Sequence, residues 1–294
     1  MNRHPSIHLI GGGTVLLQQD HQRVYCWDWQ AGRLLHRQPG YFIGVARDGR
    51  SFLLEAYDDT IHAIETRSGT PIPLGSIAQQ DYAPGQRCTL LLTRQMLEIR
   101  DVLRNEIVHA IELSRFERDP RGASFSAASL APEGDFLALT ISGDSMFGEW
   151  ARGYCLDSQE ALRFAFSASP SPEHPQLRMN ARGRYLLVEA SIQHFSLWDM
   201  QADERVTDYQ IEAPGYLIAL DDEETPPIIV LQDASNHLEL HQGRTLLGRK
   251  MLEDPVDDGV FLPDQRQLAL LLNSGEIALY DWRANEQTDR FRLP

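Results

Sequence analysis

The sequence predicts an all-β protein, a seven-bladed β-propeller of four-stranded antiparallel blades, from three observations. A unit consisting of a polar turn, an apolar strand, a short polar loop and an alternating strand recurs along the whole chain. The spacing inside this unit is nearly constant, and the unit closes on an aromatic-acidic or similar pair of residues. Apolar stretches before and after each unit add two further strands, which makes four strands per unit.

Counting from the turn to the first residue of the closing pair tests the repeat. Three copies are visible by eye, at residues 46–66, 180–200 and 262–282. The separation is 15 positions in five units: Gly12 to Trp27, Gly49 to Ile64, Gly85 to Arg100, Gly183 to Trp198 and Gln265 to Tyr280. It is 17 positions from Glu224 to His241 and 22 from Gly134 to Leu156, where an insertion around residues 143–150 accounts for the excess. Seven units result.

These units leave no residues for a second domain, although 294 residues would suffice for two on length alone. We expect residues 1–294 to form a single β-propeller domain, with blades at approximately residues 6–38, 41–75, 76–113, 123–167, 175–212, 215–252 and 257–294. A blade has two faces to cover, and a ring gives it a neighbour on both sides. We expect whole blades to follow one another, so that blade 1 closes the ring by packing against blade 7 without a shared strand.

The closing pairs carry a resemblance to a known family. Trp27-Asp28, Trp198-Asp199 and the near-match Tyr280-Asp281 resemble the closing pairs of WD40 repeats, and at blade spacing the resemblance covers essentially the whole chain. The family's Gly-His dipeptide is absent, so its usual hydrogen-bond network is not expected here. We expect the three aromatic residues to pack between sheets, with Trp29 and Trp282 facing the same side two positions later.

Composition limits the classes of partner. The chain has 27 basic and 42 acidic residues, a formal charge of −15, which repels nucleic acid and anionic lipid and favours a protein partner with a basic surface. Only one cation is a lysine, Lys250, so arginine-carboxylate pairs are expected. Three widely spaced cysteines indicate neither a disulfide framework nor a thiolate metal site. Without a signal-peptide core or a membrane-spanning segment, we expect a cytoplasmic protein.

No motif in the chain indicates a cofactor, a catalytic nucleophile or a metal. The sequence contains no GxSxG elbow, P-loop or dinucleotide-binding fingerprint. His237 and His241 lie on one face of a predicted strand, but they lack the HExxH pattern and a third ligand. The acidic runs at residues 221–224, 253–254 and 257–258 lack EF-hand spacing, and we interpret them as solvated loops.

The resemblance to WD40 propellers implies a non-catalytic protein-interaction scaffold. The alternative is an enzyme of the hydrolase or lactonase type, or a small-ligand or metal binder, that uses the central channel. That alternative requires polar residues to converge at one mouth of the channel. Candidates in the loops between second and third strands are Asp20, His21, Asp58, Asp59, His194 and Asp233.

The insertion in blade 4 is the feature that breaks the repeat. It places Met146, Phe147 and Trp150 in or beside a loop between the second and third strands. Apolar residues in such a loop either contact a partner or fold back over the propeller's own core. We predict a partner-binding surface around blade 4, with Phe147 and Trp150 as anchors and Arg118 and Arg121 as polar contacts from the connection before it.

Overall fold

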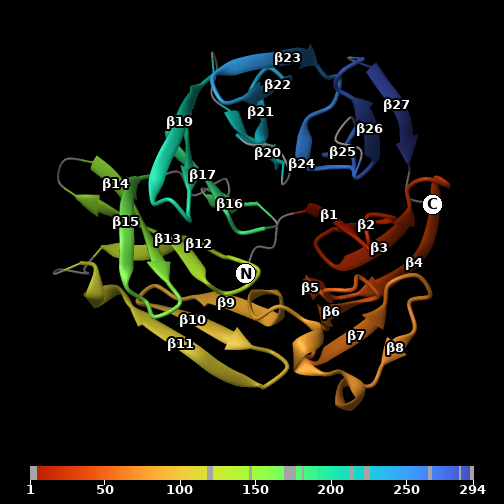
Figure 1. Ribbon diagram of the computed structural model, residues 1–294, viewed down its shortest axis with the longest axis horizontal. Helices are drawn as coiled ribbons and strands as arrows, with labels where there is room; N and C mark the ends of the chain where they lie inside the picture. The colour runs from red at the N-terminus through yellow and green to blue at the C-terminus, as the bar shows by residue number, and fades with distance from the viewer. Residues whose placement is uncertain are drawn as a thin grey trace.

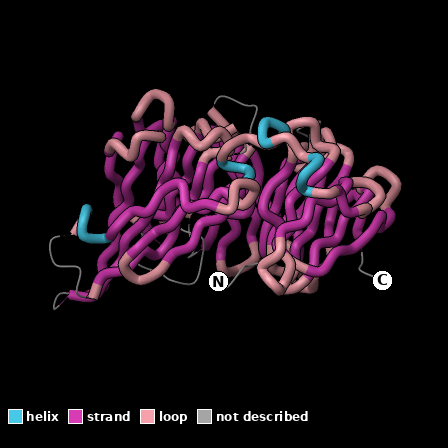
Figure 2. The backbone as a smooth tube through the Cα atoms, turned by 90° about the horizontal axis from the view of Figure 1, so that it is seen from below, coloured by secondary structure: helices cyan, strands magenta, loops and turns pink. Residues whose placement is uncertain are grey.

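Seven antiparallel sheets are arranged around a central axis in the computed structural model (Figure 1). The structure describes residues 5–117, 122–145, 148–168, 177–180, 182–191, 193–211, 215–221, 226–263, 267–284 and 286–291. Seen at right angles, the strands form a flattened disc with loops on both faces (Figure 2). The predicted fold class, a seven-bladed propeller, is confirmed.

Each sheet is built from consecutive strands that follow one another from the axis outward. Blade 1 contains β1 (Ser6–Ile10), β2 (Val15–Gln19), β3 (Arg23–Asp28) and β4 (Arg33–Pro39), and blade 2 contains β5 (Tyr41–Val45), β6 (Ser51–Glu55), β7 (Ile61–Glu65) and β8 (Pro71–Ile72). Blade 3 contains β9 (Cys88–Leu92), β10 (Met96–Asp101) and β11 (Glu106–Glu112). Blade 4 contains β12 (Ala123–Leu130), β13 (Phe136–Ser145), β14 (Gly148–Asp157) and β15 (Leu162–Ser167).

The remaining blades repeat the four-stranded pattern. Blade 5 contains β16 (Leu177–Met179), β17 (Tyr185–Ser191), β18 (His194–Asp199) and β19 (Glu204–Gln210). Blade 6 contains β20 (Gly215–Leu220), β21 (Ile228–Asp233), β22 (His237–Gln242) and β23 (Thr245–Met251), and blade 7 contains β24 (Val256–Phe261), β25 (Gln267–Leu272), β26 (Ile277–Asp281) and β27 (Glu286–Phe291). The described residues also form four short 3₁₀ helices, η1 (Leu74–Ser76), η2 (Gln79–Asp81), η3 (Gly85–Arg87) and η4 (Leu113–Arg115). Within the described residues, no helix is both long and apolar enough to cross a membrane.

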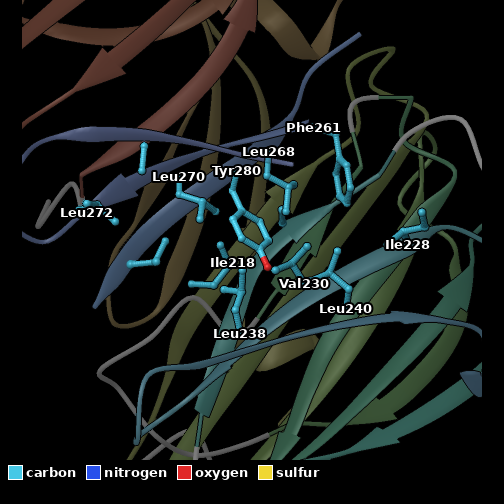
Figure 3. Close-up of a cluster of buried hydrophobic side chains, with 13 residues drawn as sticks. Ile218, Ile228, Val230, Leu238, Leu240, Phe261, Leu268, Leu270, Leu272 and Tyr280 are labelled. Atoms are coloured by element: carbon cyan, nitrogen blue, oxygen red, sulfur yellow. The ribbon is translucent and has the colours of Figure 1, made fainter. Parts of the chain in front are cut away.

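A hydrophobic cluster lies in each interface between neighbouring blades. Figure 3 shows the cluster between blades 6 and 7, where the ring of Tyr280 lies among side chains that include Ile218 and Val230. Trp27 packs against blade 7, and Trp198 packs against blade 4. The first residue of the closing pair therefore faces the preceding blade, and the predicted packing of these aromatic residues between sheets is confirmed.

Blade 1 meets blade 7 without exchanging a strand. The sheets β1–β4 and β24–β27 each contain only consecutive strands. Their interface joins Ile7 and Trp27 to Leu271 and Phe291, and the rings of Trp27 and Phe291 stack with centroids 6.1 Å apart. In Figure 1 the red first blade and the dark blue last blade lie side by side. Blade 1 thus closes the ring by packing against blade 7 without a shared strand, as the order of the segments predicts.

Blade 3 departs from the four-strand pattern because its innermost strand is missing. By register with blade 2, residues 77–81 would form this strand, but residues 79–81 adopt a turn of 3₁₀ helix, η2, and residues 78–81 are exposed. This segment is polar, and prolines at positions 71, 73 and 84 remove backbone donors on both sides of it. Pro71 lies in the shortest strand described, the two-residue β8, and Pro73 directly follows it.

The insertion in blade 4 lengthens a hairpin. Strands β13 and β14 are each 10 residues long and stay paired from Phe136↔Asp157 to Ser145↔Gly148. Met146 and Phe147 lie outside the described residues, between these two strands. Trp150 lies in β14, opposite Gly143.

Two acidic residues of the predicted solvated runs are buried. Asp221 is 0% exposed and Asp258 is 7% exposed, so the solvated-loop interpretation is wrong for both. Asp258 lies in the inner strand β24, where an arginine from another blade compensates its charge.

Candidate functional site

The inner strands surround a cavity of about 840 Å³ at the centre of the ring. In its wall, Arg178 Nη1 on β16 lies 2.5 Å from Asp258 Oδ1 on β24, and the same guanidinium donates hydrogen bonds to the carbonyl oxygens of Ile218 and Gly259. Asp258 Oδ2 accepts the backbone N–H of Ile7 at 2.8 Å. Arg178 and Asp258 thus connect blades 1, 5, 6 and 7.

A histidine borders this network. Ser6 Oγ lies 3.1 Å from His8 Nε2, and the ring of His8 lies 4.7 Å from that of Phe42. Burial lowers the pKa of His8 below its ordinary value, while the nearby Asp258 carboxylate acts in the opposite direction. A neutral imidazole therefore suits this part of the channel wall.

The six loop residues proposed for a channel-centred activity do not converge there. None of Asp20, His21, Asp58, Asp59, His194 and Asp233 is among the described residues that line the central cavity. Two of the aspartates instead stabilise their own turns. Asp20 accepts hydrogen bonds from the backbone N–H groups of Gln22 and Arg23, and Asp58 accepts one from the backbone N–H of Thr60. His194 Nδ1 lies 3.0 Å from Ser191 Oγ.

Asp233 also has a structural role, together with the two histidines of β22. Burial alone would raise the pKa of Asp233, but hydrogen bonds from His237 and Ser235 outweigh that effect and hold the pKa below its usual value. His237 Nδ1 lies 3.1 Å from Asp233 Oδ2, and His241 Nε2 lies 3.1 Å from Glu239 Oε2. Among the residues that the structure describes, no group of three or more His, Cys, Asp or Glu side chains is placed to hold a metal ion.

The predicted blade 4 surface is described only in part. Arg118, Arg121, Met146 and Phe147 all lie outside the described residues. Trp150 is half-buried, packs against the core between blades 3 and 4, and has the guanidinium of Arg152 5.3 Å from its ring centroid. Trp150 therefore covers part of the propeller's own core, and its remaining surface lies on the long hairpin of blade 4.

A second surface, which the sequence did not single out, is a groove of about 820 Å³ between blades 2 and 3. Its blade 2 side consists of Tyr41, Glu55, Ala56, Tyr57 and Asp59, and its blade 3 side consists of Thr89, Leu91, Glu98, Arg100, Asn105 and Ile107. Three apolar side chains are unusually exposed here: Tyr57 at 57%, Leu91 at 45% and Ile107 at 54%. The groove crosses all three strands of blade 3.

Charged residues at core positions of the repeat keep this interface open. Arg100 occupies the position held by Trp27, Trp198 and Tyr280 in other blades, so its side chain faces blade 2. Glu98, two positions earlier on the same strand, faces the same way. Burying such charges without full compensation is costly, so the two sheets do not close over them. Arg100 Nη2 instead donates a hydrogen bond to Asn105 Oδ1.

Packing between blades 2 and 3 involves few fully buried side chains. Of the described clusters between blades, this one has the fewest fully buried members: Ala46, Leu53, Ala63 and Tyr82. Tyr82 comes from the segment that replaces the missing inner strand, and its hydroxyl lies 2.8 Å from Ser51 Oγ. The signal in the sequence was Arg100 at a position where three other repeats have Trp or Tyr.

No protein-family model matches the sequence, and no curated protein matches it. Solved structures do match. The β-propeller domain of Cps50 (Swd1) from Myceliophteria thermophila is 13% identical, with a TM-score of 0.68 over 94% of this chain and 96% of that one. A chain of the Mitotic Checkpoint Complex is 12% identical, with a TM-score of 0.61 over 94% and 86%. The structure of U3-55K is 11% identical, with a TM-score of 0.60 over 92% and 89%. At these identities the likeness shows the β-propeller fold alone.

Proposed function

We propose that this chain is a non-catalytic protein-interaction module that binds a partner protein on one face of the disc, over blades 2 to 4. That face carries the loops between the second and third strands of each blade, including Tyr57 and Asp59 of the groove, and the groove continues between blades 2 and 3 to the β10–β11 turn at Asn105. The main observation in support of this proposal is the open groove between blades 2 and 3. Its exposed Tyr57, Leu91 and Ile107 are apolar side chains beside charged ones, the combination typical of protein-binding surfaces.

Two further observations support a protein partner. The polar groups of the central channel described above are engaged in contacts between blades, with Arg178 and Asp258 as the main pair. A similar propeller belongs to the Mitotic Checkpoint Complex, so the fold is compatible with membership of a protein assembly. The formal charge of −15 favours a partner with a basic surface.

The blade 4 surface belongs to the same proposal. We propose five residues as additional contacts: Arg118, Arg121, Met146, Phe147 and Trp150. The long hairpin of β13 and β14 supports this because it lies beside blade 3, on the side opposite the groove. A partner that spans blades 2 to 4 would contact both surfaces.

The test is affinity purification of the tagged full-length protein from extracts of its native cells. One bait carries Leu91→Asp and Ile107→Asp, which place charges in the groove. The control bait carries Leu162→Asp and Leu246→Asp, at rim positions that are 57% and 51% exposed. We expect a stoichiometric partner to co-purify with wild type and control and to be depleted at least about 10-fold from the groove variant, a loss of roughly 1.4 kcal/mol in binding free energy. Equal recovery by all three baits contradicts the use of the groove, and absence of any stoichiometric partner contradicts the proposal itself.

A parallel bait tests blade 4 separately. It carries Phe147→Ala and Trp150→Ala, and a second version adds Arg118→Ala and Arg121→Ala. Loss of the partner from these baits supports the extended surface. Full retention by the fourfold variant, with the groove variant still defective, restricts the interface to blades 2 and 3.

A further inference from the structure

The inner edge of β9 is unlike the equivalent edge in any other blade. In the other six sheets, an innermost strand pairs with the second strand. In blade 3 the described pairing runs β11-β10-β9 and stops, so β9 has a strand partner on one side only. The burial of the strands is consistent with this missing partner. The second strands β2 and β21 are buried throughout, whereas β9 contains no fully buried residue.

The register of β9 shows which backbone groups face the open edge. Thr93 N–H donates to the carbonyl oxygen of Met96, and Val102 N–H donates to that of Arg87. Hydrogen-bonded pairs alternate in an antiparallel ladder, so Thr89 and Leu91 direct their N–H and C=O groups toward β10. Cys88, Leu90 and Leu92 therefore direct theirs away from β10, toward the position of the missing strand.

The chain itself fills only one end of that position. Gly85 N–H donates to the carbonyl oxygen of Pro132 beside blade 4, and the Gln86 side-chain oxygen accepts the N–H of Val45 in blade 2. Helix η3 thus bridges blades 2 and 4 next to Cys88. Beyond Cys88, Thr89 and Leu91 line the open groove together with Tyr41, the first residue of β5. On the same strand, Leu90 lies between these two groove residues and Leu92 follows them.

We propose that blade 3 is completed by a short extended segment of a partner protein, which pairs with the free edge of β9 at Leu90 and Leu92 and extends into the groove. This inference rests on the proposed function and specifies how the partner is held. Backbone pairing supplies affinity in such strand addition, and side-chain pockets supply specificity. An exposed edge of this kind is otherwise prone to unwanted pairing.

The inner strands of the other blades and the charges of the groove indicate the chemistry of the segment. The chain's own inner strands occupy the same position in other blades and are rich in small and apolar residues, as in Ser6–Ile10, Tyr41–Val45 and Gly215–Leu220. The groove carries the carboxylates of Glu55, Asp59 and Glu98 against one guanidinium, that of Arg100. A segment with an apolar centre flanked by Lys or Arg therefore fits best.

Amide hydrogen exchange measured residue by residue by NMR tests the pairing directly. The probes are synthetic peptides with the sequences Ser6–Ile10, Tyr41–Val45 and Gly215–Leu220, each flanked by two lysines, and matched peptides flanked by two glutamates. In the free protein, the amides of Leu90 and Leu92 should exchange fast while those of Thr89 and Leu91 are protected by β10. A lysine-flanked peptide should slow exchange at Leu90 and Leu92 by at least about 10-fold and leave Thr89 and Leu91 unchanged.

Four outcomes overturn the strand-addition proposal. They are binding without new protection at Leu90 and Leu92, protection of these amides in the free monomer, protection that appears only as the protein dimerises, and no binding by any lysine-flanked peptide. The first leaves the groove as a side-chain site, the second and third assign the edge to this chain or to a second copy, and the fourth rejects the proposed chemistry. None of them affects recovery of a partner by affinity purification, so failure here is distinguishable from failure of the proposed function.

A pair of variants at Leu90 isolates the backbone contribution. Leu90→Pro removes the N–H that faces the free edge without removing a ladder bond to β10. Leu90→Ala is the control, since the Leu90 side chain packs toward blade 4 and both variants lose it. We expect Leu90→Ala to bind the peptide and Leu90→Pro to lose at least about 10-fold in affinity, equivalent to about 1.4 kcal/mol. Equal affinity of the two folded variants overturns the proposal, and if the proline variant does not fold, the exchange pattern of the wild type decides.

Discussion

The acidic residue of the closing pair stabilises the turn that leads into the outermost strand. Asp199 accepts the backbone N–H groups of Gln201 and Ala202, and Asp281 accepts those of Arg283 and Ala284. Asp101 does the same for two residues of its own turn and also pairs with Arg87, whose Nε lies 2.8 Å from its carboxylate. One residue type thus ends a strand, and in blade 3 it also compensates a buried cation.

The double role of Asp101 predicts an unequal cost of removing equivalent residues. Both Asp101→Ala and Asp281→Ala lose a turn cap, a loss of about 1 kcal/mol in free energy of unfolding. Asp101→Ala also leaves the guanidinium of Arg87 buried without its charge partner, so its total loss should be about 3 kcal/mol or more. Urea denaturation of the two variants measures the difference. Equal losses would show that the Arg87–Asp101 pair adds nothing to stability.

The segment between β8 and β9 decides the shape of blade 3. It adopts three short 3₁₀ helices in place of an inner strand, and its last helix lies against β5. The contact is close because Gly44 has no side chain: a Cβ atom there would lie 1.8 Å from the carbonyl oxygen of Gln86. Gly44 therefore allows η3 to pack directly against β5, immediately before β9 begins.

This close approach predicts a strong effect of one added methyl group. Gly44→Ala should lower the free energy of unfolding by about 2 kcal/mol or more, because the obstacle is backbone and not a flexible side chain. Gly75→Ala is the matched control in the same region, since a Cβ there meets no atom within 4 Å. It should change stability by less than about 0.5 kcal/mol. Thermal unfolding of both variants checks the prediction, and it is wrong if Gly44→Ala is as stable as Gly75→Ala.

Polar contacts in the channel wall reinforce the closure of the whole ring. The hydrophobic cluster between blades 1 and 7 lies beside the hydrogen bond from Ile7 N–H to Asp258, and Arg178 extends this link to blade 5. His8 is part of the same wall and is flanked by Ser6, Phe42, Asp258 and Arg178. Its protonation would add a positive charge where burial opposes one.

Acidification should therefore weaken the closed ring through His8. The folded-state pKa of His8 is lowered from the ordinary 6.5, so the unfolded chain takes up a proton in a pH range where the folded chain does not. The stability linked to His8 is present above pH 6.5 and is lost as the pH falls below it. The free energy of unfolding of wild type should drop more steeply between about pH 7 and 5 than that of His8→Asn. His21→Asn, at an exposed loop position, should retain the wild-type slope; identical slopes for all three proteins would contradict the assignment.

Local patterns in the sequence were sufficient to predict the ring of seven blades. Strand alternation, the turn and the closing pair all lie within about 20 consecutive residues, and each is stabilised by contacts inside its own blade or with the next. The packing of Trp27, Trp198 and Tyr280 between blades followed from the same register. The lengthened hairpin of blade 4 was also visible, as a spacing that was too long.

Only the tertiary structure decided what happens around blade 3. The spacing from Gly85 to Arg100 is that of a regular repeat, so counting alone assigned a complete blade there. Whether Arg100 is buried with a partner or holds an interface open depends on the facing side chains of blade 2, which lie far away in the sequence. The burial of Asp258 likewise depends on Arg178, 80 residues away along the chain. Sequence periodicity predicts which face of a sheet a side chain lies on. Only the neighbouring blades determine whether that side chain is buried, paired with an opposite charge or left accessible to a partner.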